Sequence, residues 1–164
     1  MKRVVFGVSV ALALMLVASS ASAVTWVQYK SSKYGVAMKL PAGTQMAASE
    51  VGGGWAALAA KFGPAKLFAV TKLGVQASPA QIEAFGMKLT GIAGNYWKMI
   101  AQGKGEHGWT WYRIYQASNS THVVWAVLGT GAKGSYLMLL WTTVADATAH
   151  TADYKTWAYN VVLF

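Results

Sequence analysis

The sequence predicts an α+β domain in which helices pack on a single antiparallel sheet, forming an α/β/α sandwich. Three observations lead to this class. Short segments of alternating apolar and polar residues fill the first half of the chain, and one capped helical segment follows them. Four further strand-like segments, separated by short turns, then precede a last segment with helical periodicity. The predicted order is therefore strands, helix, four-stranded meander, helix.

The first half of the sequence consists of short alternating runs that end at glycine or proline. The Gly63-Pro64 pair separates two such runs and predicts a hairpin between them. Residues 44–54, "TQMAASEVGGG", fit either a loop or a weak edge strand. The predicted strands are Thr25–Lys30, Val36–Pro41, Trp55–Phe62 and Ala65–Leu73.

The strongest helix signal begins at Ser78. Ser78 is followed directly by Pro79 and, two residues later, by Gln81, the pattern of a capping box with proline in the first turn. Gly86 weakens this helix because glycine has a low helix propensity. One apolar stripe recurs at helical spacing and predicts a core face rather than a ligand site: Ile82, Phe85, Leu89 and Ile92.

Four more strands follow, and their short connections predict sequential antiparallel neighbours. They are Tyr96–Gln102, Trp109–Gln116, His122–Gly129 and Ser135–Thr142. The last segment has apolar residues at positions i, i+3, i+4 and i+7, which predict a closing helix from about Thr148. These apolar residues are Tyr154, Trp157, Ala158 and Val161.

Residues 1–23 have the features of a Sec signal peptide. A positively charged start precedes an apolar run over Val4–Ala18, and the small residues Ala21 and Ala23 predict cleavage after Ala23. The alternative is a membrane anchor, but this run and every later one is shorter than the roughly 20 residues that a spanning helix needs. We therefore expect one mature domain, residues 24–164, that is periplasmic or secreted.

The composition limits the classes of function. The chain is 55% hydrophobic and 12% charged and has no cysteine, which excludes disulfides, thiolate chemistry and cysteine metal sites. Without Lys2 and Arg3, the 14 basic residues become 12 against 5 acidic ones, so the net charge falls from +9 to +7. The lysines are scattered singly, which disfavours nucleic acid binding and fits a solubilising role. The same charge also fits an anionic partner outside the cytoplasm, either an envelope protein or an anionic polymer or surface.

Groups suited to catalysis are scarce. Three histidines in different segments and 5 acidic residues offer few general acids and bases, and no Gly-x-Ser-x-Gly motif occurs. Residues 129–135, "GTGAKGS", resemble a phosphate loop, but the lysine precedes the last glycine and a strand follows, which predicts a hairpin turn. The sequence therefore predicts no catalytic residue, no cofactor and a protein that is not an enzyme.

Asp146, His150 and Asp153 define an alternative function. Their spacing places them on one face of a helix, where two carboxylates and an imidazole could hold a divalent metal. The simpler interpretation is that Asp146 complements the helix dipole and that the other two side chains are solvated. The main prediction contains no metal site, and a metal-dependent enzyme or metal-binding protein is the alternative.

The aromatic strand is the candidate ligand site. Alternation places Trp109, Trp111, Arg113 and Tyr115 on one face, where aromatic rings and a guanidinium could bind an anion or a sugar ring. The competing interpretation is that a central strand of a sandwich needs large side chains on both faces. We expect Trp111 to pack in the core and Trp109, next to a loop, to be the most exposed of the four.

Four segments together resemble the PsbP-like family, which includes small exported bacterial relatives of the extrinsic photosystem II subunit. They are "YKSSKYGVAMKLPAG", "SPAQIEAFGMKL", "HGWTWYRIYQ" and "WAYNVVLF". The resemblance covers nearly the whole of residues 24–164 and implies an α/β/α sandwich. It also implies a non-enzymatic accessory or binding protein, which we expect to be a monomer or a weak oligomer.

Overall fold

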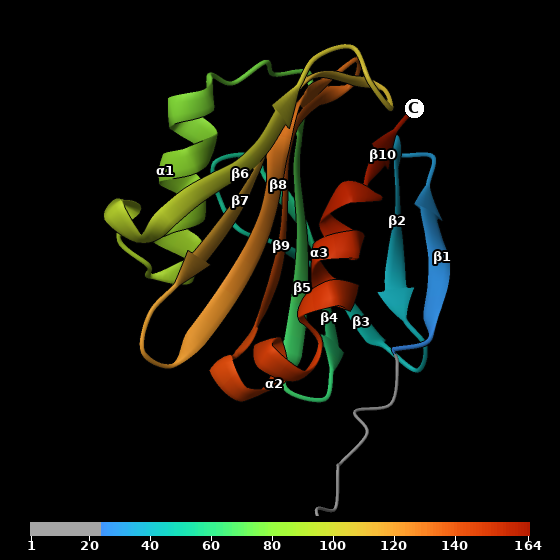
Figure 1. Ribbon diagram of the computed structural model, residues 1–164. Helices are drawn as coiled ribbons and strands as arrows, with labels where there is room; N and C mark the ends of the chain where they lie inside the picture. The colour runs from blue at the N-terminus through green and yellow to red at the C-terminus, as the bar shows by residue number, and fades with distance from the viewer. Residues whose placement is uncertain (1–23) are drawn as a thin grey trace, which may run out of the picture.

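The computed structural model describes residues 24–164 (Figure 1). The predicted signal peptide, residues 1–23, lies outside the described residues. Within them, no helix is both long and apolar enough to cross a membrane. The elements in chain order are β1 (Trp26–Ser31), β2 (Val36–Pro41), β3 (Gln45–Glu50), β4 (Ala56–Phe62), β5 (Ala65–Leu73), α1 (Pro79–Thr90), a 3-10 turn (Gly94–Tyr96), β6 (Trp97–Gly103), β7 (Trp109–Ser118), β8 (His122–Gly131), β9 (Gly134–Thr143), α2 (Val144–Ala149), α3 (Thr151–Tyr159) and β10 (Val162–Leu163).

A seven-stranded sheet forms the centre of the molecule, with strand order β3-β4-β5-β9-β8-β7-β6. Every pair of neighbours in it is antiparallel. The four strands predicted as a meander, β6 to β9, pair in sequence order, and β4 and β5 form the predicted hairpin. The ambiguous residues 44–54 contain β3, which is one edge of this sheet.

The prediction of a single sheet is wrong. β1 and β2 pair with each other, and β2 pairs along its other edge with β10, which makes a second sheet of three strands. In β10, Val162 and Leu163 lie opposite Ala37 and Val36. A strand of two residues is too short to show alternation, so the sequence pattern could not reveal the element that completes the small sheet.

The large sheet is covered on both faces (Figure 1). Helix α1 packs against β8 and β9 on one face, and α2 and α3 lie on the other, with the small sheet beside α3. Every residue of β8 after His122 is buried, as is every residue of β9 from Gly134 to Leu140. Both faces of these central strands are therefore buried, and their sequences are nearly continuous runs of apolar residues, as expected for the middle of a sandwich.

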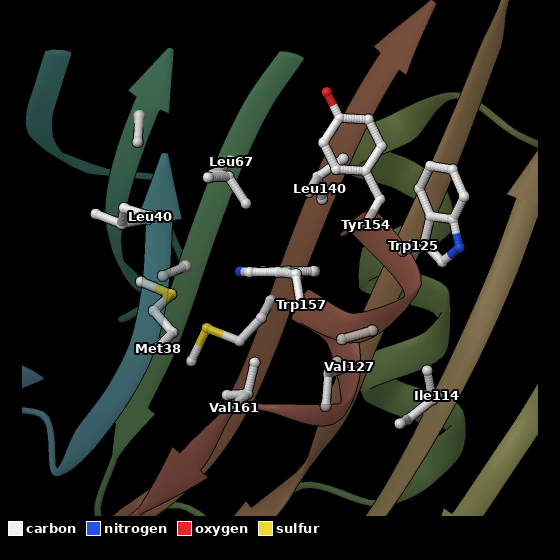
Figure 2. Close-up of a cluster of buried hydrophobic side chains, with 14 of the residues drawn as sticks. Met38, Leu40, Leu67, Ile114, Trp125, Val127, Leu140, Tyr154, Trp157 and Val161 are labelled. Atoms are coloured by element: carbon white, nitrogen blue, oxygen red, sulfur yellow. The ribbon is translucent and has the colours of Figure 1, made fainter. Parts of the chain in front are cut away.

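Trp157 of α3 lies in the middle of the core on the α3 face (Figure 2). The side chains of Met38, Leu67, Val127 and Val161 lie around it in this cluster, and Trp157 is only 2% exposed. Met38 comes from β2, while Leu67 and Val127 come from the large sheet. The small sheet is thus joined to the large one by shared apolar packing and not by strand pairing.

Helix α1 begins with the predicted capping box. The Ser78 hydroxyl accepts a hydrogen bond from the Gln81 backbone N–H, and Gln81 Oε1 accepts one from the Ser78 N–H at 2.9 Å. Gly86 is buried against the sheet, and a Cβ at this position would lie 2.9 Å from Cη2 of Trp97. The Trp97 indole in turn donates to the Ile92 carbonyl at 3.1 Å. The glycine that weakens the helix therefore makes room for Trp97.

The closing helix differs from the prediction of one helix starting at about Thr148. Two helices are present, because the chain leaves helical geometry at His150, where φ is −122° and ψ is 22°. The first of them, α2, starts earlier than predicted, with the Thr143 hydroxyl accepting a hydrogen bond from the Asp146 N–H at 3.3 Å. The four predicted apolar residues are all buried: Tyr154, Trp157, Ala158 and Val161.

Gly86→Ala should destabilise the domain, even though alanine favours a helix by about 1 kcal/mol over glycine. The added methyl must displace the ring of Trp97, and overpacking a core costs roughly 1–3 kcal/mol. Urea unfolding measures the change in the free energy of unfolding. Ala84→Gly, at an exposed position of the same helix, is the control, because it measures the difference in helix propensity between alanine and glycine without a packing contribution. A stability gain in Gly86→Ala equal to the loss in Ala84→Gly would contradict the close contact.

Candidate functional site

The four predicted site residues lie on β7, but they do not share one face. The register between β7 and β8 shifts between Trp109 and Trp111, and this bulge turns Trp109 into the core on the α3 face. Trp109 is 3% exposed, and its Nε1 donates to the Val161 carbonyl at 3.1 Å. The prediction that Trp109 is the most exposed of the four is therefore wrong, because a bulge interrupts the alternation on which it relied.

Trp111 and Arg113 lie on the α1 face and are half-buried. They line an open pocket of about 650 Å³ next to the start of α1 and the adjoining ends of β6 and β7. We call this concavity the Arg113 pocket. Its lining residues are Pro79, Gln102, Gly103, Lys104, Trp111, Tyr112 and Arg113. Trp111 packs against the core on the α1 face, as expected, but it is only half-buried because its side chain also borders this opening.

Helix α1 holds the Arg113 side chain in place. Arg113 Nη1 donates to Glu83 Oε1 at 2.6 Å, and the Tyr115 hydroxyl donates to the same oxygen at 2.6 Å. The hydrogen bond to Glu83 raises the pKa of Arg113, so the guanidinium keeps its charge. Burial, reinforced by the hydrogen bond to Glu83, raises the pKa of the Tyr115 hydroxyl. Tyr115 is 8% exposed and supports the site from behind instead of lining the pocket.

The pocket lining contains two cations and no carboxylate. The Arg113 side chain keeps 33% of its surface exposed despite its bond to Glu83. Lys104 is exposed, and among the side chains that the structure describes no lysine takes part in an ion pair. Glu83 offsets the charge of Arg113, so the net positive charge at the Arg113 pocket comes from Lys104, next to an aromatic wall and the remaining guanidinium donors, an arrangement that attracts anions.

Sequence reasoning missed Glu83, Gln102 and Lys104 as parts of the site. Glu83 is the only acidic residue of α1, and a single carboxylate beside a core-facing stripe was a signal for a cationic partner in the sheet. Gln102 and Lys104 carried no such signal, since they belong to a strand end and a turn whose position depends on the sheet order. Their place beside Arg113 follows from the pairing of β6 with β7.

The arrangement around Asp146 gives no support to the alternative metal site. The two carboxylates of Asp146 and Asp153 lie 3.9 and 3.6 Å from the ring nitrogens of His150. Asp146 Oδ2 already accepts hydrogen bonds from the hydroxyls of Thr142 and Tyr154, each at 2.6 Å. In the part of the chain that the structure describes, no group of three His, Asp or Glu side chains is placed to hold a metal ion. Asp146 instead joins β9, α2 and α3.

The seven-stranded sheet with helices on both faces defines an α/β/α sandwich with the PsbP-like fold. The fold is similar to the solution structure of cyanobacterial PsbP (CyanoP) from Synechocystis sp. PCC 6803, with a TM-score of 0.61 and 12% sequence identity. The similarity covers 86% of this chain and 94% of that chain. No protein-family model matches the sequence, and no curated protein matches it. The comparison confirms the fold that the sequence motifs indicated.

Trp109→Ala should lower the free energy of unfolding by roughly 3–5 kcal/mol, because a large buried aromatic side chain is lost together with its hydrogen bond to the Val161 carbonyl. Trp111→Ala should lower it by clearly less, because the Trp111 side chain already borders solvent. Urea unfolding of both variants measures the difference. Equal losses would show that Trp111 is a core residue and that the Arg113 pocket is closed in solution.

Proposed function

We propose that this chain is an exported, non-enzymatic accessory protein that binds an anionic partner through the Arg113 pocket. The observation that carries the proposal is Arg113 itself. Its guanidinium is fixed by Glu83 at 2.6 Å, stays one-third exposed and borders a pocket of about 650 Å³ beside Trp111. Charged groups placed in a concave, partly apolar site provide specific recognition of a partner with the opposite charge.

The lining of the Arg113 pocket supports binding and offers little for catalysis. A general acid or base works best when its pKa lies near the working pH, and neither a histidine nor a carboxylate lines the pocket. The pKa of Arg113 is raised by Glu83, and that of Tyr112 is raised by burial and by its hydrogen bond to Glu106. Both groups therefore keep their protons near neutral pH. The resemblance to PsbP-like proteins supports the same non-enzymatic role.

The features of residues 1–23 support a location outside the cytoplasm. A basic start, an apolar run and small residues before position 24 are typical of a cleaved signal peptide. The absence of cysteine also suits an oxidising compartment, where a free thiol would be open to unwanted oxidation. In such a compartment the envelope and its anionic polymers and surfaces are the available partners.

The exported protein should begin at Val24. Expression of the full chain with its own N-terminus in a Gram-negative host, followed by fractionation and N-terminal sequencing, tests this prediction. Changing Ala21 and Ala23 to large residues should block cleavage, because signal peptidase requires small side chains there. A mature protein that begins at Met1 and stays in the membrane fraction would show that residues 1–23 are an anchor.

Purified residues 24–164 should co-sediment with isolated cell envelopes of the source organism, and Arg113→Gln should reduce the bound fraction severalfold. Lys61→Gln is the matched control, because it makes the same charge change at an exposed position of β4, four strands away from β7 in the sheet. Equal reductions in the two variants would show that envelope binding depends on the overall positive charge of the protein and not on the Arg113 pocket. Absence of envelope binding in the unaltered protein would overturn the proposed function.

A further inference from the structure

The Arg113 pocket presents two cations, one held by an ion pair and one without such a partner among the described side chains. Arg113 is fixed, because Glu83 Oε1 accepts from its Nη1 while also accepting from Tyr115, whose ring is buried. Lys104 is exposed in the turn after β6 and has no ion-pair partner among the described side chains. A fixed guanidinium sets the orientation of an anionic group, and a mobile ammonium can close on that group from the other side.

The Arg113 guanidinium has further N–H donors besides the one that binds Glu83. A guanidinium carries five N–H groups in a planar fork, and that of Arg113 donates from Nη1 to Glu83. The remaining donors match the two oxygens of a carboxylate, which arginine binds in a bidentate manner. Because Glu83 holds the side chain before any ligand arrives, little conformational entropy is lost on binding.

The Arg113 pocket is much larger than an anionic group. A volume of about 650 Å³ lies within the 300–1,000 Å³ that is usual for small-molecule sites, whereas a simple carboxylate would occupy only a corner of it. The wall beside Arg113 consists of the half-buried Trp111 and of Pro79 and Gly103. The indole is a flat apolar surface, and it suits a flat body that stacks on it.

From these contacts we infer that the Arg113 pocket binds a ring compound bearing a carboxylate. The carboxylate lies between Arg113 and Lys104, the face of the ring stacks on Trp111, and the Gln102 amide is available to polar substituents of the ring. Glu83 is a positioning residue that orients Arg113. This inference rests on the site of the proposed function and names its ligand chemistry, which a sugar acid and an aromatic acid share.

The test is isothermal titration of residues 24–164 with two acids and their neutral counterparts. The acids are trigalacturonate and 2-naphthoate, and the neutral counterparts are maltotriose and 2-naphthamide. At least one acid should bind about tenfold or more tightly than its neutral counterpart, since charge-assisted hydrogen bonds from arginine are the strongest contacts available in this pocket. The acid that binds identifies the sugar or the aromatic source.

Four variants assign the contacts. Arg113→Lys keeps the positive charge but removes the planar fork of donors. Lys104→Gln removes the second positive charge of the pocket. Each variant should bind the acid severalfold more weakly than the unaltered protein. Glu83→Gln should also weaken binding of the acid while leaving binding of the neutral compound unchanged. A merely structural defect would weaken the binding of both compounds. Lys61→Gln, the control remote from the pocket, should bind like the unaltered protein.

Three results would overturn the inference. They are equal binding of the acid and its neutral counterpart, no binding of either acid, and unchanged acid binding in both Arg113→Lys and Lys104→Gln. Because Lys104 is exposed, its variant folds even where a change at Arg113 disturbs the sheet. If neither acid binds while the envelope assay still depends on Arg113, the proposed function stands and the ring-carboxylate ligand is wrong.

Discussion

Burial of β8 and β9 on both faces is the constraint on which the rest of the structure depends. Leu128 and Leu137 point to the α1 face, and Val127 and Met138 point to the α3 face, each at most 1% exposed. Exposing such side chains costs roughly 1.5–3 kcal/mol each, and a chain without cysteine has no disulfide to offset that cost. Helix α1 on one side, and α2, α3 and the small sheet on the other, supply the cover that these two strands require.

The same constraint explains why the pocket lies on β7. A helix is about 10 Å wide and strands are spaced about 4.8 Å apart, so one helix covers roughly two strands. Helix α1 packs on β8 and β9, which leaves the neighbouring β7 and the edge strand β6 only partly covered. Trp111 and Arg113 are half-buried for this reason, and Glu83 is the α1 side chain that reaches back across the gap to Arg113.

Features that depend on local chemistry were predictable from the sequence. The capping box at Ser78 and the turns of the meander involve residues within a few positions of one another. Features that depend on distant pairing were not. β10 and β2 lie near opposite ends of the described sequence, and Glu83 and Arg113 are separated by 30 positions in the sequence. The bulge before Trp111 is a local feature, yet alternation assumes a regular strand and therefore placed Trp109 on the wrong face.

The pairing of β10 with β2 also has a consequence for the folding kinetics. Leu163 donates to the His107 carbonyl at 2.8 Å and Phe164 donates to the Gly35 carbonyl at 2.9 Å, so the last residues tie together three distant parts of the chain. Contacts of such high sequence separation slow folding, because a long loop must close before they form. The small sheet cannot be completed until residues 162–164 are available.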